Sequence, residues 1–122
     1  MKPRLRESEA DISRSIQDYL HANKIFAWRN NSGAMSGTSS TGKKRFFHFG
    51  MQGSADIIGV LPGGQFLAIE CKSAKGKLSQ AQELFRDAVQ RNGGLWILAR
   101  DLRDVIAGLQ GEHIVPFSSV PM

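Results

Sequence analysis

The chain has 122 residues, of which 41% are hydrophobic and 22% charged, and this composition is typical of a globular domain and unlike that of a disordered chain. Sixteen lysine and arginine residues against eleven acidic residues give a net charge of +5, which favours a polyanionic partner such as nucleic acid or an acidic membrane surface. We predict one domain over residues 1–122, because the chain is too short for two well-packed cores.

The single cysteine excludes an internal disulfide and favours a reducing compartment. No run of about 18 apolar residues is present, as a membrane span requires, and the N-terminal residues contain no apolar segment for secretion. We therefore expect a cytosolic protein that does not enter a membrane.

Periodicity and turn residues predict the elements of the first half of the chain. Residues 8–22 should form an amphipathic helix and residues 25–30 a strand. Residues 31–44 are rich in Gly, Ser and Thr and poor in apolar residues, so we predict a long loop there. Residues 45–49 should form a strand, and residues 50–54 a turn that leads into Asp56.

The second half is predicted to contain a hairpin, two helices and one more strand. The hairpin strands are residues 56–61 and 65–71, and a basic loop follows at 73–77. The next helix ends before residue 92, and residues 95–99 are predicted to form a fully buried strand. A last helix runs from Asp101 to about residue 109. The remaining residues are predicted to be irregular, with one edge strand at most. Capping boxes are expected at two helix starts, Ser8 with Asp11 and Ser79 with Gln82. Trp28 and Trp96 lie in apolar runs and are predicted to pack in the core.

The hairpin can bring two carboxylates together. A three-residue loop of Pro62, Gly63 and Gly64 pairs Leu61 with Gln65, and the same register places Asp56 opposite Glu70, with Cβ atoms about 4.5–5.5 Å apart. A two-residue loop would shift the register by one residue and move the acids to opposite faces. The register is thus the premise on which the site depends.

Two carboxylates opposite each other in an apolar segment need a compensating charge. A hard divalent cation such as Mg²⁺ supplies it, because Mg²⁺ binds one or two carboxylates and keeps waters for chemistry. Lys72 lies one step further on the face of Glu70 and can orient an attacking water or offset charge on a phosphoryl transition state. The simpler interpretation is that Asp56, Glu70 and Lys72 mark strand ends that meet water, and the spacing alone does not exclude it.

Further segments make the pattern more specific. The stretch "GSADIIGVLPGGQFLAIECK" resembles the Asp and Glu-x-Lys motif of the PD-(D/E)xK nuclease superfamily. With "ESEADISRSIQDYL", "WRNNSG", "HFGMQGSAD", "KLSQAQELF" and "NGGLWILARDLRDV", the chain from about residue 7 to 105 resembles a stand-alone virus-type replication-repair nuclease (VRR-NUC) domain, as found in bacteriophages and bacteria. Ala55 departs from the proline that often precedes the aspartate in that family.

The resemblance implies an α/β fold with a restriction-endonuclease-like core, in which helices flank a mixed sheet in αβββαβ order. It implies Mg²⁺- or Mn²⁺-dependent hydrolysis of DNA, with a preference for branched, flap or junction DNA. Asp56 and Glu70 would bind the metal with help from the Cys71 carbonyl, and Lys72 would be catalytic. Glu9 would be the acid of the first helix, with Asp11 as the second choice, and Gln82 would lie near the site. The Cys71 thiol itself is interpreted as a small buried group.

Basic residues are expected to contact DNA phosphates as a group. They lie in loops and at the N-terminus: Lys2, Arg4, Arg6, Arg29, Lys43, Lys44, Arg45, Lys75 and Lys77. Two other functions stay open, a catalytically silent nucleic-acid-binding module and a nuclease that cuts plain duplex DNA. A homodimer is expected, since a chain this small gains reach over a branched duplex by pairing.

Overall fold

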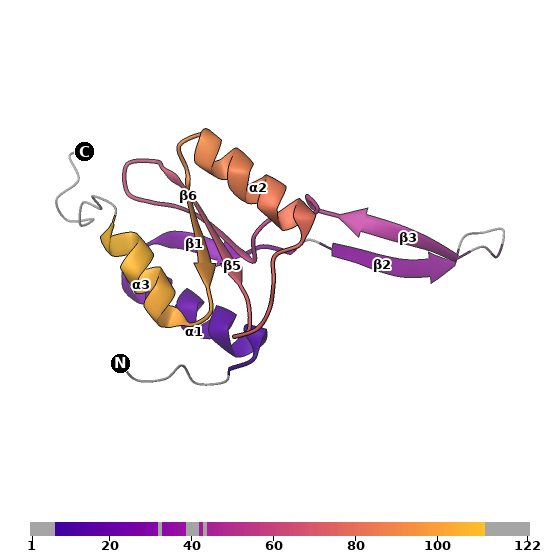
Figure 1. The fold of residues 1–122 in the computed structure, drawn as a ribbon, viewed down its shortest axis with the longest axis horizontal. Helices are drawn as coiled ribbons and strands as arrows, with labels where there is room; N and C mark the ends of the chain where they lie inside the picture. The colour runs from indigo at the N-terminus through magenta and orange to yellow at the C-terminus, as the bar shows by residue number, and fades with distance from the viewer. Residues whose placement is uncertain (1–6, 32, 39–41, 43, 112–122) are drawn as a thin grey trace.

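A four-stranded mixed β-sheet carries the fold of this computed structural model, which describes residues 7–31, 33–38, 42 and 44–111 (Figure 1). The strands are β1 (Phe26–Arg29), β4 (Ile57–Val60), β5 (Phe66–Cys71) and β6 (Leu95–Ala99), in the order β1-β4-β5-β6. The pairs β1–β4 and β4–β5 are antiparallel, and β5–β6 is parallel. The predicted mixed sheet of an α/β fold is confirmed.

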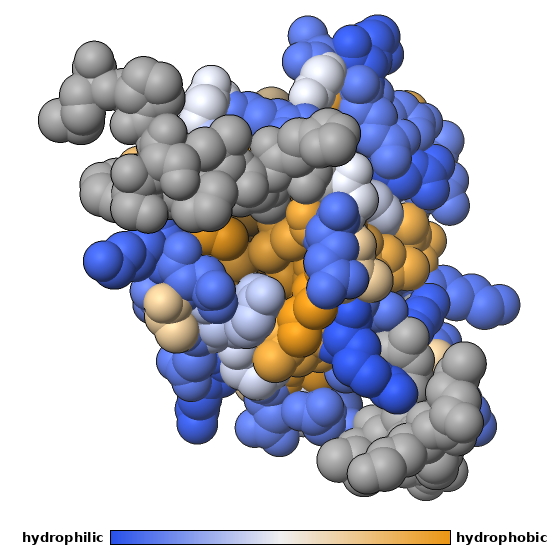
Figure 2. Space-filling view, turned by 90° about the vertical axis from the view of Figure 1, so that its left-hand side faces the viewer, coloured by the Kyte–Doolittle hydropathy of each residue, from blue (hydrophilic) through white to orange (hydrophobic). Residues whose placement is uncertain are grey.

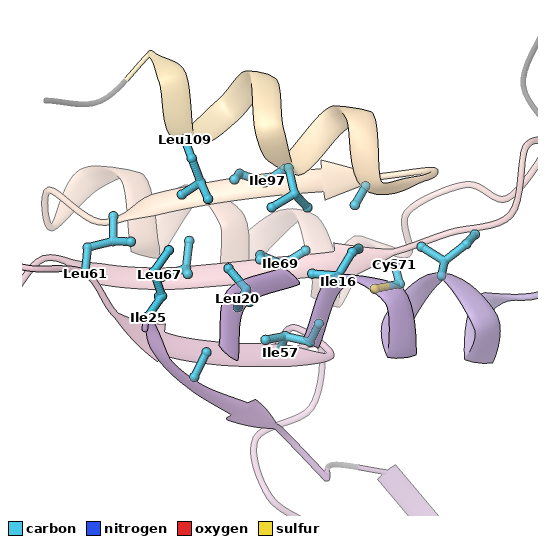
Figure 3. Packing of buried hydrophobic residues seen from close by; sticks show 14 residues of the cluster. Ile16, Leu20, Ile25, Ile57, Leu61, Leu67, Ile69, Cys71, Ile97 and Leu109 are labelled. Carbon is cyan, nitrogen blue, oxygen red and sulfur yellow. The ribbon is translucent and has the colours of Figure 1, made fainter. Parts of the chain in front are cut away.

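Helices cover both faces of this sheet. Helices α1 (Glu9–Ala22) and α3 (Leu102–Gln110) pack on one face, and α2 (Gln80–Arg91) packs on the other. The main core lies on the α1 and α3 side, where apolar side chains from helices and strands point toward one another (Figure 3): Ile16, Leu20, Ile57, Ile69, Ile97 and Leu109. A smaller cluster under α2 contains Ala55, Ile58, Ala68 and Val89, with Phe85 and Trp96 packed against it.

The predicted N-caps are present at the helix starts, but of the two predicted capping boxes only the one at α2 has both bonds, and at α1 the described bond is the N-cap bond of Ser8. The Ser8 hydroxyl accepts a hydrogen bond from the Asp11 amide at 3.1 Å. At α2 both bonds of the capping box form, because Ser79 Oγ accepts from the Gln82 amide at 3.2 Å and Gln82 Oε1 accepts from the Ser79 amide at 2.9 Å. Asp101 caps α3, with its carboxylate accepting from the Arg103 amide. These local bonds begin each helix where the sequence predicted it.

The predicted loop over residues 31–44 is wrong in its central part. Residues Gly33–Thr38 form strand β2, which pairs antiparallel with β3 (Lys44–Phe49) in a separate two-stranded sheet, from Gly33 opposite Phe49 to Thr38 opposite Lys44. The pair extends away from the four-stranded sheet (Figure 1). The segment is rich in Gly, Ser and Thr and shows no apolar alternation, so periodicity does not predict a strand there.

Two burial predictions also need correction. In β6, Ile97 and Ala99 are buried, whereas Leu95, Trp96 and Leu98 are only partly buried, because β6 is an outer strand of the sheet. Trp96 packs as predicted against the cluster under α2, but Trp28 on the other outer strand is 42% exposed. The predicted tail beyond residue 111 lies outside the described residues. Over the ranges that the structure describes, no helix combines the length and apolar character that a membrane crossing requires.

Candidate active site

The β4–β5 hairpin has the register that the sequence predicted. Ile57 pairs with Ile69 and Val60 with Phe66, while the Leu61 amide donates to the Gln65 carbonyl at 2.8 Å across the Pro-Gly-Gly turn. One step beyond the Ile57–Ile69 pair, the same register sets Asp56 against Glu70. The two acids are therefore brought together at the end of the hairpin that is remote from the turn.

The acid pair is buried and tightly coupled. Glu70 is 3% exposed and hydrogen-bonds with Asp56, and Asp56 Oδ2 also accepts from the Cys71 amide at 2.7 Å. The pKa of Glu70 is raised from its ordinary 4.5 to about 9, mainly by burial and in addition by the hydrogen bond and the negative charge of Asp56. At neutral pH, without a cation, Glu70 thus holds a proton that it donates to Asp56.

Lys72 lies next to this pair. Its charge lowers the pKa of Glu70 and so opposes the effects of burial and of Asp56. Its amide donates to the Ala99 carbonyl at 3.0 Å, and Arg100 Nη1 donates to the carbonyl of the following residue, Ser73, at 2.6 Å. These bonds tie the end of β5 to the end of β6 and fix the backbone that carries Lys72.

Asn30 holds the segment that leads into Asp56. Its side-chain Nδ2 donates to Ser54 Oγ at 2.8 Å and to the Ala55 carbonyl at 3.1 Å, and its amide donates to the Asp56 carbonyl at 2.7 Å. Asn30 lies in the segment "WRNNSG", and the sequence pattern alone did not predict a role for it. Its position directly after a strand, in an Asn-Asn pair, was the available signal.

Replacing Asn30 by alanine is expected to loosen Asp56 without unfolding the chain. The variant loses two side-chain hydrogen bonds to residues 54 and 55, so Asp56 is less well oriented toward Glu70. Groups that orient metal ligands commonly change metal affinity by about 10- to 100-fold when they are removed. Titration calorimetry with Mn²⁺ measures the effect, and Asn31→Ala, at the exposed neighbouring residue, is the control. Equal Mn²⁺ affinity of Asn30→Ala and the parent would contradict a positioning role.

A cleft of about 530 Å³ opens between α1 and Asp56 of the acid pair. It is lined by Asp56 and Cys71, by Arg29 at the end of β1, and by one side of α1: Glu9, Ala10, Ser13, Arg14, Gln17, Asp18 and His21. Glu9 is exposed and its charge raises the pKa of Glu70, whereas Asp11 does not line the cleft. Of the two candidate acids on the first helix, Glu9 is the one placed near the pair.

The cleft adds residues that the sequence reasoning missed. Arg14, Gln17, Asp18 and His21 recur at helical spacing on α1, so a polar helix side at this spacing was the signal that could have revealed them. His21 Nε2 lies 3.1 Å from the Ala27 carbonyl and links α1 to β1. With Arg29, Arg14 gives the cleft two cations beside the carboxylates.

Cys71 and Gln82 have clear structural roles. The Cys71 side chain is buried in the core on the α1 side, on the opposite face from Glu70, and burial raises the pKa of its thiol to about 12. The thiol is therefore neutral at physiological pH, in agreement with a small buried group. The Gln82 side-chain oxygen is used in the cap of α2, and no hydrogen bond joins its described side chain to the acid pair.

The predicted phosphate contacts fall in different parts of the chain. Arg29 is exposed at the cleft, and Lys75 and Lys77 are exposed in the loop between β5 and α2. Lys44 and Arg45 lie in β3, where the backbone is described, and Lys43 lies outside the described residues, as do Lys2, Arg4 and Arg6. The structure thus places three of these residues, Arg29, Lys75 and Lys77, at described surface positions.

The donor set of the pair suits a hard cation. One of the two carboxylates keeps its proton because of burial and of its neighbour, and a Mg²⁺ or Mn²⁺ ion in place of that proton would compensate the charge of both. Among the side chains that the structure describes in residues 7–31 and 44–111, no three from His, Cys, Asp or Glu lie close enough together to hold a metal ion. Glu9 therefore stands near the pair and does not complete a three-carboxylate group.

Comparison of the chain with protein-family models, with curated proteins and with solved structures finds no match in any of the three.

Proposed function

We propose that the chain is a metal-dependent DNA endonuclease that hydrolyses phosphodiester bonds in branched, flap or junction DNA. The observation that carries the proposal is the buried Asp56–Glu70 pair with Lys72 beside it. A buried, coupled acid pair at the edge of a polar cleft is an arrangement more typical of a reactive site than of a strand end in water. The resemblance of the motifs to VRR-NUC domains supports DNA as the substrate and a restriction-endonuclease-like core as the fold.

Asp56 and Glu70 would hold Mg²⁺ or Mn²⁺, with the Cys71 carbonyl as a further candidate ligand and Glu9 close by. When bound, such a cation polarises the phosphodiester and activates water for attack. The preference for branched DNA rests on the resemblance alone.

The chain's own residues supply the remaining chemistry. Lys72 lies beside the acids, and its side chain stabilises the negative charge that develops on the phosphoryl oxygens in the transition state. The Cys71 amide and Asn30 keep Asp56 in one orientation, so that little reorganisation is needed during the reaction. Arg14 and Arg29 stand at the cleft where a phosphate of the bound strand can be neutralised.

A panel of DNA substrates tests the proposal. Flap, fork, four-way junction, duplex and single-stranded DNA are incubated with the protein in Mg²⁺, in Mn²⁺ or in EDTA. Metal-dependent cleavage of branched substrates in preference to duplex is the expected result, and Asp56→Asn should abolish it. If duplex DNA were cleaved as fast as branched DNA, the chain would be a nuclease that cuts plain duplex DNA. If the protein bound the substrates but cleaved none of them, the chain would instead be a catalytically silent nucleic-acid-binding module.

A further inference from the structure

Three aromatic side chains are exposed on one face of the four-stranded sheet. Phe26 is 68%, Trp28 42% and Phe66 40% exposed, and the Phe26 and Trp28 rings lie 5.2 Å apart between centroids at 49° to each other. Figure 2 shows that hydrophobic residues reach the surface as a band between hydrophilic ones on the side of the molecule at the left of Figure 1. Exposed apolar groups that adjoin one another indicate a surface for binding.

The sheet register joins these rings into one surface. Val60 pairs with Phe26 on one side and with Phe66 on the other, so these three side chains form a row on the same face of the sheet. Trp28 lies two residues after Phe26 in β1 and therefore shares this face. We call Phe26, Trp28 and Phe66 the aromatic face. Helix α2 packs on this side of the sheet through Phe85 and Val89, yet it leaves the β1 part uncovered.

The aromatic face adjoins the acid pair. Trp28 pairs with Ile58, and Asp56 lies two residues before Ile58, so the register separates the rows of Trp28 and Asp56 by about 7 Å along the strands. Glu70 lies four residues after Phe66 in β5 and so shares the side of the sheet that carries the aromatic face, whereas Asp56 lines the cleft on the α1 side. An extended chain of nucleotides that passes the end of β1 can therefore reach from the aromatic face to the acid pair.

An unpaired DNA strand fits this surface better than a second copy of the chain does. Aromatic rings stack on the faces of bases, which are accessible in single strands and hidden inside a duplex. A DNA strand brings negative charge to a chain of net charge +5, whereas a second copy brings another +5. We infer that Phe26, Trp28 and Phe66 stack the bases of the unpaired strand of the substrate and lead its backbone to the acid pair. This inference rests on the proposed function.

Fluorescence in EDTA tests stacking apart from cleavage. The chain contains two tryptophans, so Trp96→Phe leaves Trp28 as the only reporter. Titration with a short oligothymidylate should quench Trp28, whereas an abasic oligonucleotide of equal length and charge should not. Equal quenching by the two would overturn the inference, because the abasic strand keeps the phosphates and lacks the bases.

Substitutions separate stacking from general apolar contact. Phe26→Ala and Trp28→Ala should each weaken oligothymidylate binding by about fivefold or more, measured by anisotropy in EDTA, and Trp28→Phe should retain binding that Trp28→Leu loses. Thermal unfolding establishes that each variant is folded. Leu84→Ala, at a side chain that is 63% exposed on α2, is the control and should bind like the parent. Retained binding in Trp28→Leu would overturn stacking.

The failure of this inference is distinguishable from the failure of the proposed function. Branched-DNA cleavage that persists while Phe26→Ala and Trp28→Ala bind single strands like the parent would overturn the aromatic face alone. Absence of cleavage on every substrate, with single-strand binding lost in both variants, would overturn the nuclease and support the aromatic face. If sedimentation showed that the two variants change a dimer into a monomer at unchanged oligonucleotide affinity, the face would be an interface between copies.

Discussion

Replacing Lys72 by alanine is expected to slow single-turnover DNA cleavage by about 10²- to 10³-fold, the effect of removing one group that stabilises transition-state charge. DNA affinity should change little, because Lys72 is only partly exposed and other cations at the surface can bind the phosphates. Mn²⁺ binding should persist, since both carboxylates remain. Single-turnover rates at saturating protein and binding measured in EDTA give the two quantities separately.

Lys75→Ala is the matched control for Lys72→Ala. Lys75 is exposed in the loop that follows Lys72, so its loss should leave the rate at saturation unchanged. If it contacts a phosphate, its loss should reduce the salt dependence of binding by a slope of about one. Cleavage by Lys72→Ala at the parent rate would make Lys72 an ordinary strand-end lysine. A binding module would then be the better interpretation of the chain.

The arrangement of the acid pair was predictable because one local feature determines it. The Pro-Gly-Gly turn sets the hairpin register, and the register sets which residues face each other, so the Asp56–Glu70 contact follows from counting residues. The helix starts were predictable for the same reason, since Ser79 and Gln82 cap α2 through bonds only three residues apart. Such contacts need no knowledge of the rest of the fold.

The features that the sequence did not predict depend on which helices and strands pack against each other in the folded chain. The segment "IFAW" contains apolar residues on both faces of β1, so its pattern does not distinguish the two faces. In the fold, α1 and α3 cover one face, whereas α2 leaves Trp28 exposed on the other. Strand β2 pairs with β3 in a Gly-, Ser- and Thr-rich segment without apolar alternation, so periodicity missed it. The cleft likewise needs α1 to lie beside Asp56, and only then does Arg14 become a residue of the site.

In metal-free protein, stability is expected to fall as pH rises from about 4.5 toward about 9, through the titration of Glu70. The folded state keeps the Glu70 proton up to a pKa of about 9, whereas the unfolded chain loses it near 4.5, so the folded state binds more protons across this window. The contribution of Glu70 is complete below pH 4.5 and is lost as pH approaches 9. Its slope is at most about 1.4 kcal/mol per pH unit.

Replacing Glu70 by glutamine should remove this contribution. Glutamine is neutral, so the variant should gain stability relative to the parent as pH rises, measured by urea unfolding in EDTA at pH 5, 6, 7 and 8. Glu83→Gln, at an exposed position on α2, should follow the parent. Added Mg²⁺ should stabilise the parent more at pH 8 than at pH 6, because the cation replaces a proton, and should stabilise Glu70→Gln little. A constant stability difference between Glu70→Gln and the parent from pH 5 to 8 would mean that Glu70 does not hold a proton beside Asp56, and the coupled acid pair would then lose its support.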